Sequence, residues 1–89
     1  MQDSPDRTIV VPMRYQVVLK GNIKAAMARR DWLGQKTAES IGLTPATFSS
    51  RLHGRTEWRM NELVELAKAL EVPFTHLTEG IDSELAVSA

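Results

Sequence analysis

The sequence contains no cysteine, and this absence removes several kinds of chemistry. Without thiols there is no disulfide framework, no thiolate metal site and no cysteine nucleophile. The two histidines, His53 and His76, lie far apart and lack the spacing of a metal-binding pair. No pairing of a base with a nucleophile points to catalysis. We therefore expect no metal, no cofactor, no small-molecule ligand and no enzymatic activity.

Long hydrophobic runs are also missing. No apolar run approaches the roughly 18 residues that cross a bilayer, and residues 1–12 lack the charged-then-apolar layout of a secretory signal. The 89 residues, 43% of them hydrophobic, suit one compact domain. We expect a soluble, cytoplasmic protein with no membrane partner.

The chain has no net charge, but its charges are unevenly distributed. Residues 20–59 contain eight basic and three acidic side chains, a net charge of +5, whereas residues 60–89 contain one basic and six acidic side chains, a net charge of −5. A clustered positive segment matters more to a polyanionic partner than the total charge does. The composition therefore still permits a nucleic acid as partner.

The stretch from Lys36 to Gly54 contains the start and stop signals of two short helices joined by a tight turn. Gly42 is suited to a helix C-terminus, where a positive φ is often needed. A threonine followed by a proline, Thr44-Pro45, is the signal of a new helix N-terminus. In the second helix, residues 45–53, Phe48 and Leu52 are expected to face the core. Its other side chains are small, polar or basic, which is typical of an outward-facing helix.

Apolar spacing predicts helices at 21–31, 35–41, 45–53 and 60–70, and a short last helix beginning at Pro73. We divide the chain into an N-terminal arm at 1–19, a helical domain at 20–80 and a C-terminal tail at 81–89. In the arm, Tyr15, Val17 and Leu19 alternate like a strand, but Pro12 is equally suited to begin a helix. Both interpretations of the arm stay open. The predicted fold class is all-α, a compact five-helix domain with a short β-like arm as an option.

This order of helices resembles the Cro/C1-type helix-turn-helix family of phage and bacterial regulators. The residues that carry the resemblance are Arg30 through Gly54, and then the run from Met60 to Leu77. It covers roughly residues 20–80, and it implies a lambda-repressor-like fold. In that family the third helix enters the major groove and the second lies across the DNA backbone.

The resemblance implies DNA-binding positions in three groups. Gln35 and Lys36 begin the second helix, where they face phosphates. The residues that occupy or flank base-facing positions are Thr44, Pro45, Ala46, Thr47, Ser49 and Ser50. Arg51, His53 and Arg55 are expected to reach phosphates from the far end. On the first helix, Lys24, Arg29 and Arg30 suit either phosphate contact or plain solvation.

The sequence departs from the family pattern at positions that matter for base recognition. Pro45 and Ala46 stand where the family often has long polar side chains, and neither can make a bidentate base contact. Ala46 can touch a thymine methyl, and the hydroxyls offer single hydrogen bonds. Specificity is then expected to rest on apolar contact, on Arg51, on water or on DNA shape. Met27 and Leu52 replace a buried Arg–Glu pair found in some members.

We predict a sequence-specific DNA-binding transcriptional regulator, a phage or bacterial repressor acting in the cytoplasm of a bacterial or phage-infected cell. The expected partner is a palindromic operator in double-stranded DNA, bound by a homodimer. Candidate dimer contacts are Leu66, the outer side of the last helix and residues 8–19. The alternative is a protein-interaction module on the same scaffold, such as an antitoxin or a partner of a recombinase or polymerase.

Overall fold

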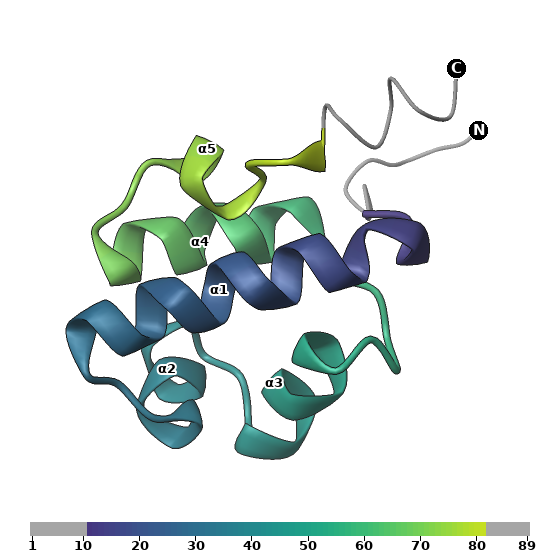
Figure 1. Ribbon diagram of the computed structural model, residues 1–89. Coiled ribbons are helices and arrows are strands. Elements are labelled where there is room, and N and C mark those ends of the chain that lie inside the picture. Colours follow the sequence, from purple (N-terminus) through teal and green to yellow (C-terminus); the bar gives the residue numbers. More distant parts are fainter. Residues whose placement is uncertain (1–10, 82–89) are drawn as a thin grey trace.

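The computed structural model describes residues 11–81, and within them the chain is helical (Figure 1). The elements in chain order are a 3-10 helix η2 at Met13–Tyr15 and the α-helices α1 at Gln16–Arg30, α2 at Gly34–Ser40, α3 at Pro45–Leu52, α4 at Met60–Leu70 and α5 at Phe74–Leu77. Figure 1 shows α2 and α3 on one side of α1, and α5 on the other. The predicted all-α, five-helix helix-turn-helix fold is confirmed. Among the described helices, none has the length and apolar character needed to span a membrane.

The first helix begins five residues earlier than predicted. The strand alternative for Tyr15 to Leu19 is wrong, because these residues close η2 and open α1. Tyr15, Leu19 and Ile23 are buried at four-residue spacing, whereas Val17 is 83% exposed. The alternation of three apolar residues therefore suggested a strand, although the buried residues follow the four-residue spacing of a helix. Residues 8–10 of the arm lie outside the described part.

The turn between α2 and α3 has the predicted construction. Gly42 has a φ of 75°, and the Leu43 amide donates to the Ala38 carbonyl at 3.0 Å, which closes the end of α2. Thr44 is the N-cap of α3, and its hydroxyl oxygen accepts a hydrogen bond from the Thr47 amide at 3.1 Å. Pro45 occupies the first position of α3, where its missing N–H costs nothing.

The core joins all five helices around two aromatic rings. Phe48 of α3 meets Trp58 edge-to-face, with ring centroids 5.9 Å apart, and both side chains are buried. Leu66 of α4 is fully buried in the same core. It is therefore wrong as a candidate dimer contact, because none of its surface is available to a second chain.

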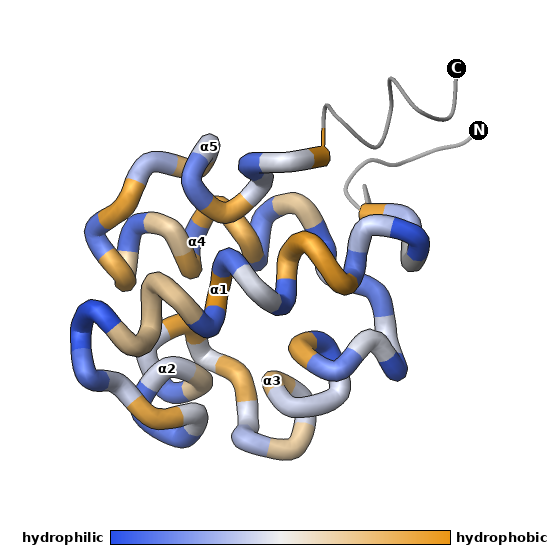
Figure 2. The backbone as a smooth tube through the Cα atoms, in the orientation of Figure 1, coloured by the Kyte–Doolittle hydropathy of each residue, from blue (hydrophilic) through white to orange (hydrophobic). Residues whose placement is uncertain are grey.

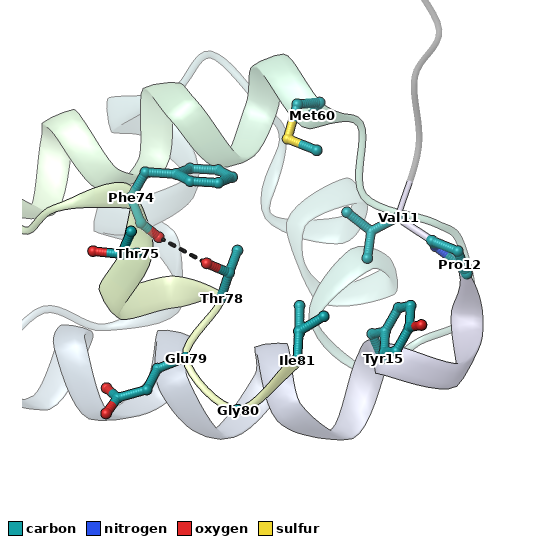
Figure 3. Close-up of a pocket in the computed structure, with 10 residues that line it drawn as sticks. All are labelled: Val11, Pro12, Tyr15, Met60, Phe74, Thr75, Thr78, Glu79, Gly80 and Ile81. Atoms are coloured by element: carbon teal, nitrogen blue, oxygen red, sulfur yellow. Dashed lines mark hydrogen bonds between the residues drawn. The ribbon is translucent and has the colours of Figure 1, made fainter. Parts of the chain in front are cut away.

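An apolar groove lies where η2, the start of α4 and α5 meet (Figure 3). Its volume is about 350 Å³, and its walls include Val11 and Tyr15 from the N-terminal side, Phe74 from α5 and Thr78 directly after α5. Val11 is fixed there by a hydrogen bond from its amide to the Trp58 carbonyl at 2.9 Å. The arm and the outer side of the last helix, both candidate dimer contacts, thus meet at one groove.

Candidate nucleic-acid interface

The outer face of α3 is open to solvent. Phe48 and Leu52 face inward, so the helical period places Ala46, Ser49, Ser50 and His53 on the opposite side. Ala46 and His53 are exposed, and the two serines are half-buried. In Figure 2 most of α3 is pale, because its small side chains are neither strongly hydrophilic nor strongly hydrophobic. A helix held by two large anchors on one side and carrying short groups on the other can approach another surface closely.

The start of α2 presents two exposed polar side chains. The Gln35 amide donates to the Glu39 carboxylate at 3.3 Å. The Lys36 ammonium lies 5.3 Å from the centre of the Trp32 ring, and the Arg30 guanidinium lies 5.0 Å from the same centre. Trp32 is half-buried against the core, so it holds Lys36 beside the first turn of α2 by a cation–π contact.

Arg51 is directed into the protein rather than away from it. Its Nε donates to Glu62 Oε1 at 2.9 Å, its Nη2 donates to Glu62 Oε2 at 3.1 Å, and its Nη1 donates to the Thr56 hydroxyl at 2.9 Å. The two charged side chains are only 14% and 10% exposed. This fork-to-fork pair ties α3 to α4 and occupies three donors of the guanidinium.

The pair also fixes the ionisation of Glu62. Burial raises the pKa of this carboxyl, but it is outweighed by the hydrogen bonds from Arg51 and from the Arg59 backbone amide, at 2.9 Å, together with the positive charges of Arg51 and Arg59. The net result is a pKa below the ordinary value for glutamate. Glu62 therefore stays charged to lower pH than an ordinary glutamate and keeps its ion pair with Arg51.

A group of cations gathers where α1 meets the end of α3. Lys20 lowers the pKa of His53 below its ordinary value, partial loss of hydration lowers it further, and Arg55 and Lys24 add to the effect. Lys24, His53 and Arg55 are exposed, and Lys20 is half-buried. The imidazole therefore stays in a field of positive charge that disfavours its own protonation.

Within residues 11–81, two of the basic side chains between 20 and 59 have acidic partners. Arg51 pairs with Glu62, and Arg30 pairs with Glu71 at 3.2 Å. The six others have no ion pair or side-chain hydrogen bond there: Lys20, Lys24, Arg29, Lys36, Arg55 and Arg59. Most of the basic segment is thus available to an external anion.

The structure places the predicted site residues on one continuous unit formed by α2, the turn and α3. Gln35 and Lys36 lie at the start of α2, and His53 and Arg55 follow α3. The Thr47 hydroxyl accepts a hydrogen bond from the Thr44 hydroxyl at 3.0 Å and keeps its own proton for donation. Their contacts with DNA stay predictions. No group of three potential metal ligands occurs within residues 11–81.

Sequence reasoning missed Lys20 and the role of Trp32. Lys20 falls at the edge of the predicted domain because α1 begins earlier than its apolar spacing indicates. A signal was present: residues 16–30 contain four basic residues and no acidic one. For Trp32 the helical period gave no signal, because this residue lies in the connection before α2.

Comparisons with known proteins support the fold. No family model matches the chain, and no curated protein matches its sequence. Among solved structures, the hypothetical transcription factor NHTF from Neisseria is similar, with a TM-score of 0.71 and 18% identity over 98% of this chain and 99% of that one. The clp gene regulator ClgR from C. glutamicum is similar with a TM-score of 0.65 and 18% identity, over 83% of this chain and 92% of that one. At this identity the likeness establishes the shared helical architecture.

Proposed function

We propose that the protein is a sequence-specific DNA-binding regulator of transcription, of the Cro/C1 type, which inserts α3 into the major groove. The observation that carries this proposal is the open face of α3, which no other described element covers. Cations without an acidic partner in the described part of the chain occur on the helix before it and in the segment after it: Lys36 in the first turn of α2, and Arg55 three residues beyond the end of α3. The similarity to two solved regulators adds support.

The short side chains of α3 define the kind of readout that we propose. Ala46 is exposed and offers a methyl group to thymine, while Ser49 and Ser50 offer one hydroxyl each. Pro45 has no donor. A helix of this kind reads its site by close fit, methyl contact and DNA shape more than by bidentate hydrogen bonds.

Phosphate contacts in this proposal come from Gln35 and Lys36 on one strand and from His53 and Arg55 on the other. Arg51 is left out of the contact set, although the sequence favoured it. Its internal pair with Glu62 would have to break before it could reach a phosphate, and breaking such a buried pair costs about 3 kcal/mol.

We further propose that the protein binds a palindromic operator as a homodimer. A single α3 with short side chains recognises few base pairs, whereas two copies read half-sites about one helical turn, ~34 Å, apart. The apolar groove between η2 and α5 is the surface that we assign to the second copy, since two of the three expected dimer contacts converge on it. A dimer bound at a promoter excludes polymerase, so repression is the expected outcome.

The proposal is tested by placing a negative charge on the side of α3 that would face the major groove of DNA. Ala46→Glu should weaken binding to a duplex by at least about 100-fold, because the carboxylate meets phosphates and base acceptors at close range. Folding should be unaffected, since Ala46 is exposed and an acidic residue in a first helical turn is favourable.

The matched control is His76→Glu, which changes an exposed residue of α5 on the other side of α1. Binding is measured by fluorescence anisotropy with a labelled duplex, and folding by circular dichroism. Equal effects of the two variants on affinity would contradict the proposed role of α3. If the wild-type protein bound no duplex, the interaction-module alternative would be favoured, with the apolar groove as its docking surface.

A further inference from the structure

The N-terminal half of α1 packs beside the segment that follows α3. Gly54 has a φ of 77°, and a Cβ atom at this position would lie 3.5 Å from the Cβ of Gln16 and 3.6 Å from its Cγ. Gln16, Lys20 and Lys24 are four residues apart, so they lie along one face of α1. The two lysines therefore continue from this contact along the side of α1 that is turned toward the end of α3.

Three cations and one imidazole meet at this junction, and we name them the junction patch: Lys20, Lys24, Arg55 and His53. In the described part of the chain, none of the four forms an ion pair or a side-chain hydrogen bond. Helices α1 and α3 contain no acidic residue, and the exposed Glu57 in the following loop pairs with none of them. The uncompensated positive charges of Lys20, Lys24 and Arg55 repel one another, so the approach of an anion lowers the electrostatic free energy of the patch.

The effect of Lys20, Arg55 and Lys24 on His53 is independent support for this grouping. All three lower the pKa of the imidazole, with Lys20 the strongest, so charges from α1 and from the segment after α3 act on one point.

We propose that the junction patch is a phosphate-binding position for the DNA strand that flanks α3, with α1 supplying two of its cations. The proposal rests on the proposed DNA-binding function and deepens it, because it assigns phosphate contacts to a helix outside the helix-turn-helix unit. Lysine ammonium groups are suited to this task, since each is a mobile point charge with three donors. The contact is independent of base sequence and adds to affinity and to salt dependence.

Salt dependence of binding separates this role from a merely solvated helix face. The probe is a fluorescent duplex of mixed sequence, about 24 base pairs long, titrated between about 50 and 200 mM NaCl. Lys20→Gln/Lys24→Gln should reduce the slope of log K against log salt by about two units, at roughly 0.9 per lost contact. At about 0.1 M salt this corresponds to more than tenfold weaker binding.

The matched control is Arg29→Gln/Lys68→Gln, which removes the same charge from exposed positions. Arg29 lies nine residues after Lys20, roughly 180° around α1, and Lys68 lies on α4 beside Glu65. The control should keep the wild-type slope to within a few tenths of a unit. Lys20→Arg/Lys24→Arg should also keep it, which verifies that charge and not a particular shape is required.

Three outcomes are distinguishable. A reduced slope for the lysine double variant alone supports the junction patch. Equal slopes for that variant and for its control overturn the inference while leaving the proposed function in place. A flat salt dependence for the wild-type protein overturns the proposed function itself. Denaturation curves show whether Lys20→Gln/Lys24→Gln is folded. If it is not, the single variant Lys24→Gln replaces it, because Lys24 is exposed. A reduced slope of log K against log salt in this variant then supports the junction patch, and an unchanged slope overturns it.

Discussion

At the scale of single residues, Arg51 is suited both to contact DNA and to form an internal ion pair with Glu62. A basic residue on an outward-facing helix is expected to reach DNA, yet the fork of hydrogen bonds to Glu62 fixes Arg51 inside the protein. The sequence could not reveal this, because the partner lies eleven residues away on another helix. Met27 and Leu52 stand where some members of the family that the sequence resembles have a buried ion pair, yet this domain still contains ionic pairing. A different pair, between α3 and α4, is present.

Glu62 predicts an acid-dependent part of the stability. Its pKa is lowered in the folded state, so its contribution is complete above the unfolded pKa, about 4.3, and is lost as pH falls through the lower folded value. Glu62→Gln should be less stable than wild type by about 3 kcal/mol at pH 7, because the buried Arg51 charge loses its partner. The variant should also lose part of the acid dependence.

Urea denaturation at a series of pH values measures both effects. Glu65→Gln is the control, since Glu65 is exposed and lies 3.8 Å from Lys68, and its effect should stay below about 0.5 kcal/mol. Coincident stability profiles for wild type and Glu62→Gln would show that the pair has no net role, and profiles separated by a constant amount would contradict its acid dependence.

His53 predicts a pH dependence of DNA binding. Lys20 first, and then Arg55 and Lys24, lower its pKa in the free protein, whereas a nearby phosphate would raise it, so binding should take up a proton. Affinity should increase as pH falls from about 8 and level off below the pKa of the free protein. His53→Gln should remove this dependence, and His76→Gln on α5 should retain it. An unchanged pH profile in His53→Gln would place His53 away from the phosphates.

At the scale of elements, two glycines make opposite contributions that the structure explains. Gly21 lies inside α1, is exposed, and a Cβ atom added to it would meet no atom within 4 Å, whereas Gly54 has a left-handed backbone beside Gln16. Gly21→Ala should raise the free energy of unfolding by about 0.5–1 kcal/mol through helix propensity. Gly54→Ala should lower it by more than about 1 kcal/mol, because an alanine resists this φ. Thermal or urea unfolding of both variants checks the signs, and a stabilised Gly54→Ala would contradict the left-handed backbone at this position.

The elements also show which local signals are reliable. The turn from α2 to α3 was predictable because Gly42 and Thr44-Pro45 act within a few residues of their own position. The start of α1 was not predictable from alternation, because Tyr15 and Leu19 satisfy both a two-residue and a four-residue period. Tertiary burial decided between them, with Val17 left outside. The open face of α3 followed from its composition, but the cations that α1 brings beside it did not, because 33 residues separate Lys20 from His53.

At the scale of the whole molecule, the absence of net charge is compatible with a polyanionic partner because the charges are segregated in space as well as in sequence. Glu62 neutralises Arg51 inside the fold, and Glu71 pairs with Arg30 at the surface. The cations that have no partner within residues 11–81 lie on α1, on α2 and in the segment that joins α3 to α4. The apolar groove is separated from α3 by α1, so dimer contact and DNA contact need not compete.

The central claim is that α3 reads a defined DNA sequence, and selection of bound duplexes from a random pool tests it most directly. We predict enrichment of a two-fold symmetric site whose half-sites are about 10 base pairs apart, as two copies on one face of the duplex require. Ala46→Glu should enrich nothing from the same pool. Recovery of no preferred sequence by the folded wild-type protein, at a salt concentration where it binds DNA, would contradict the account.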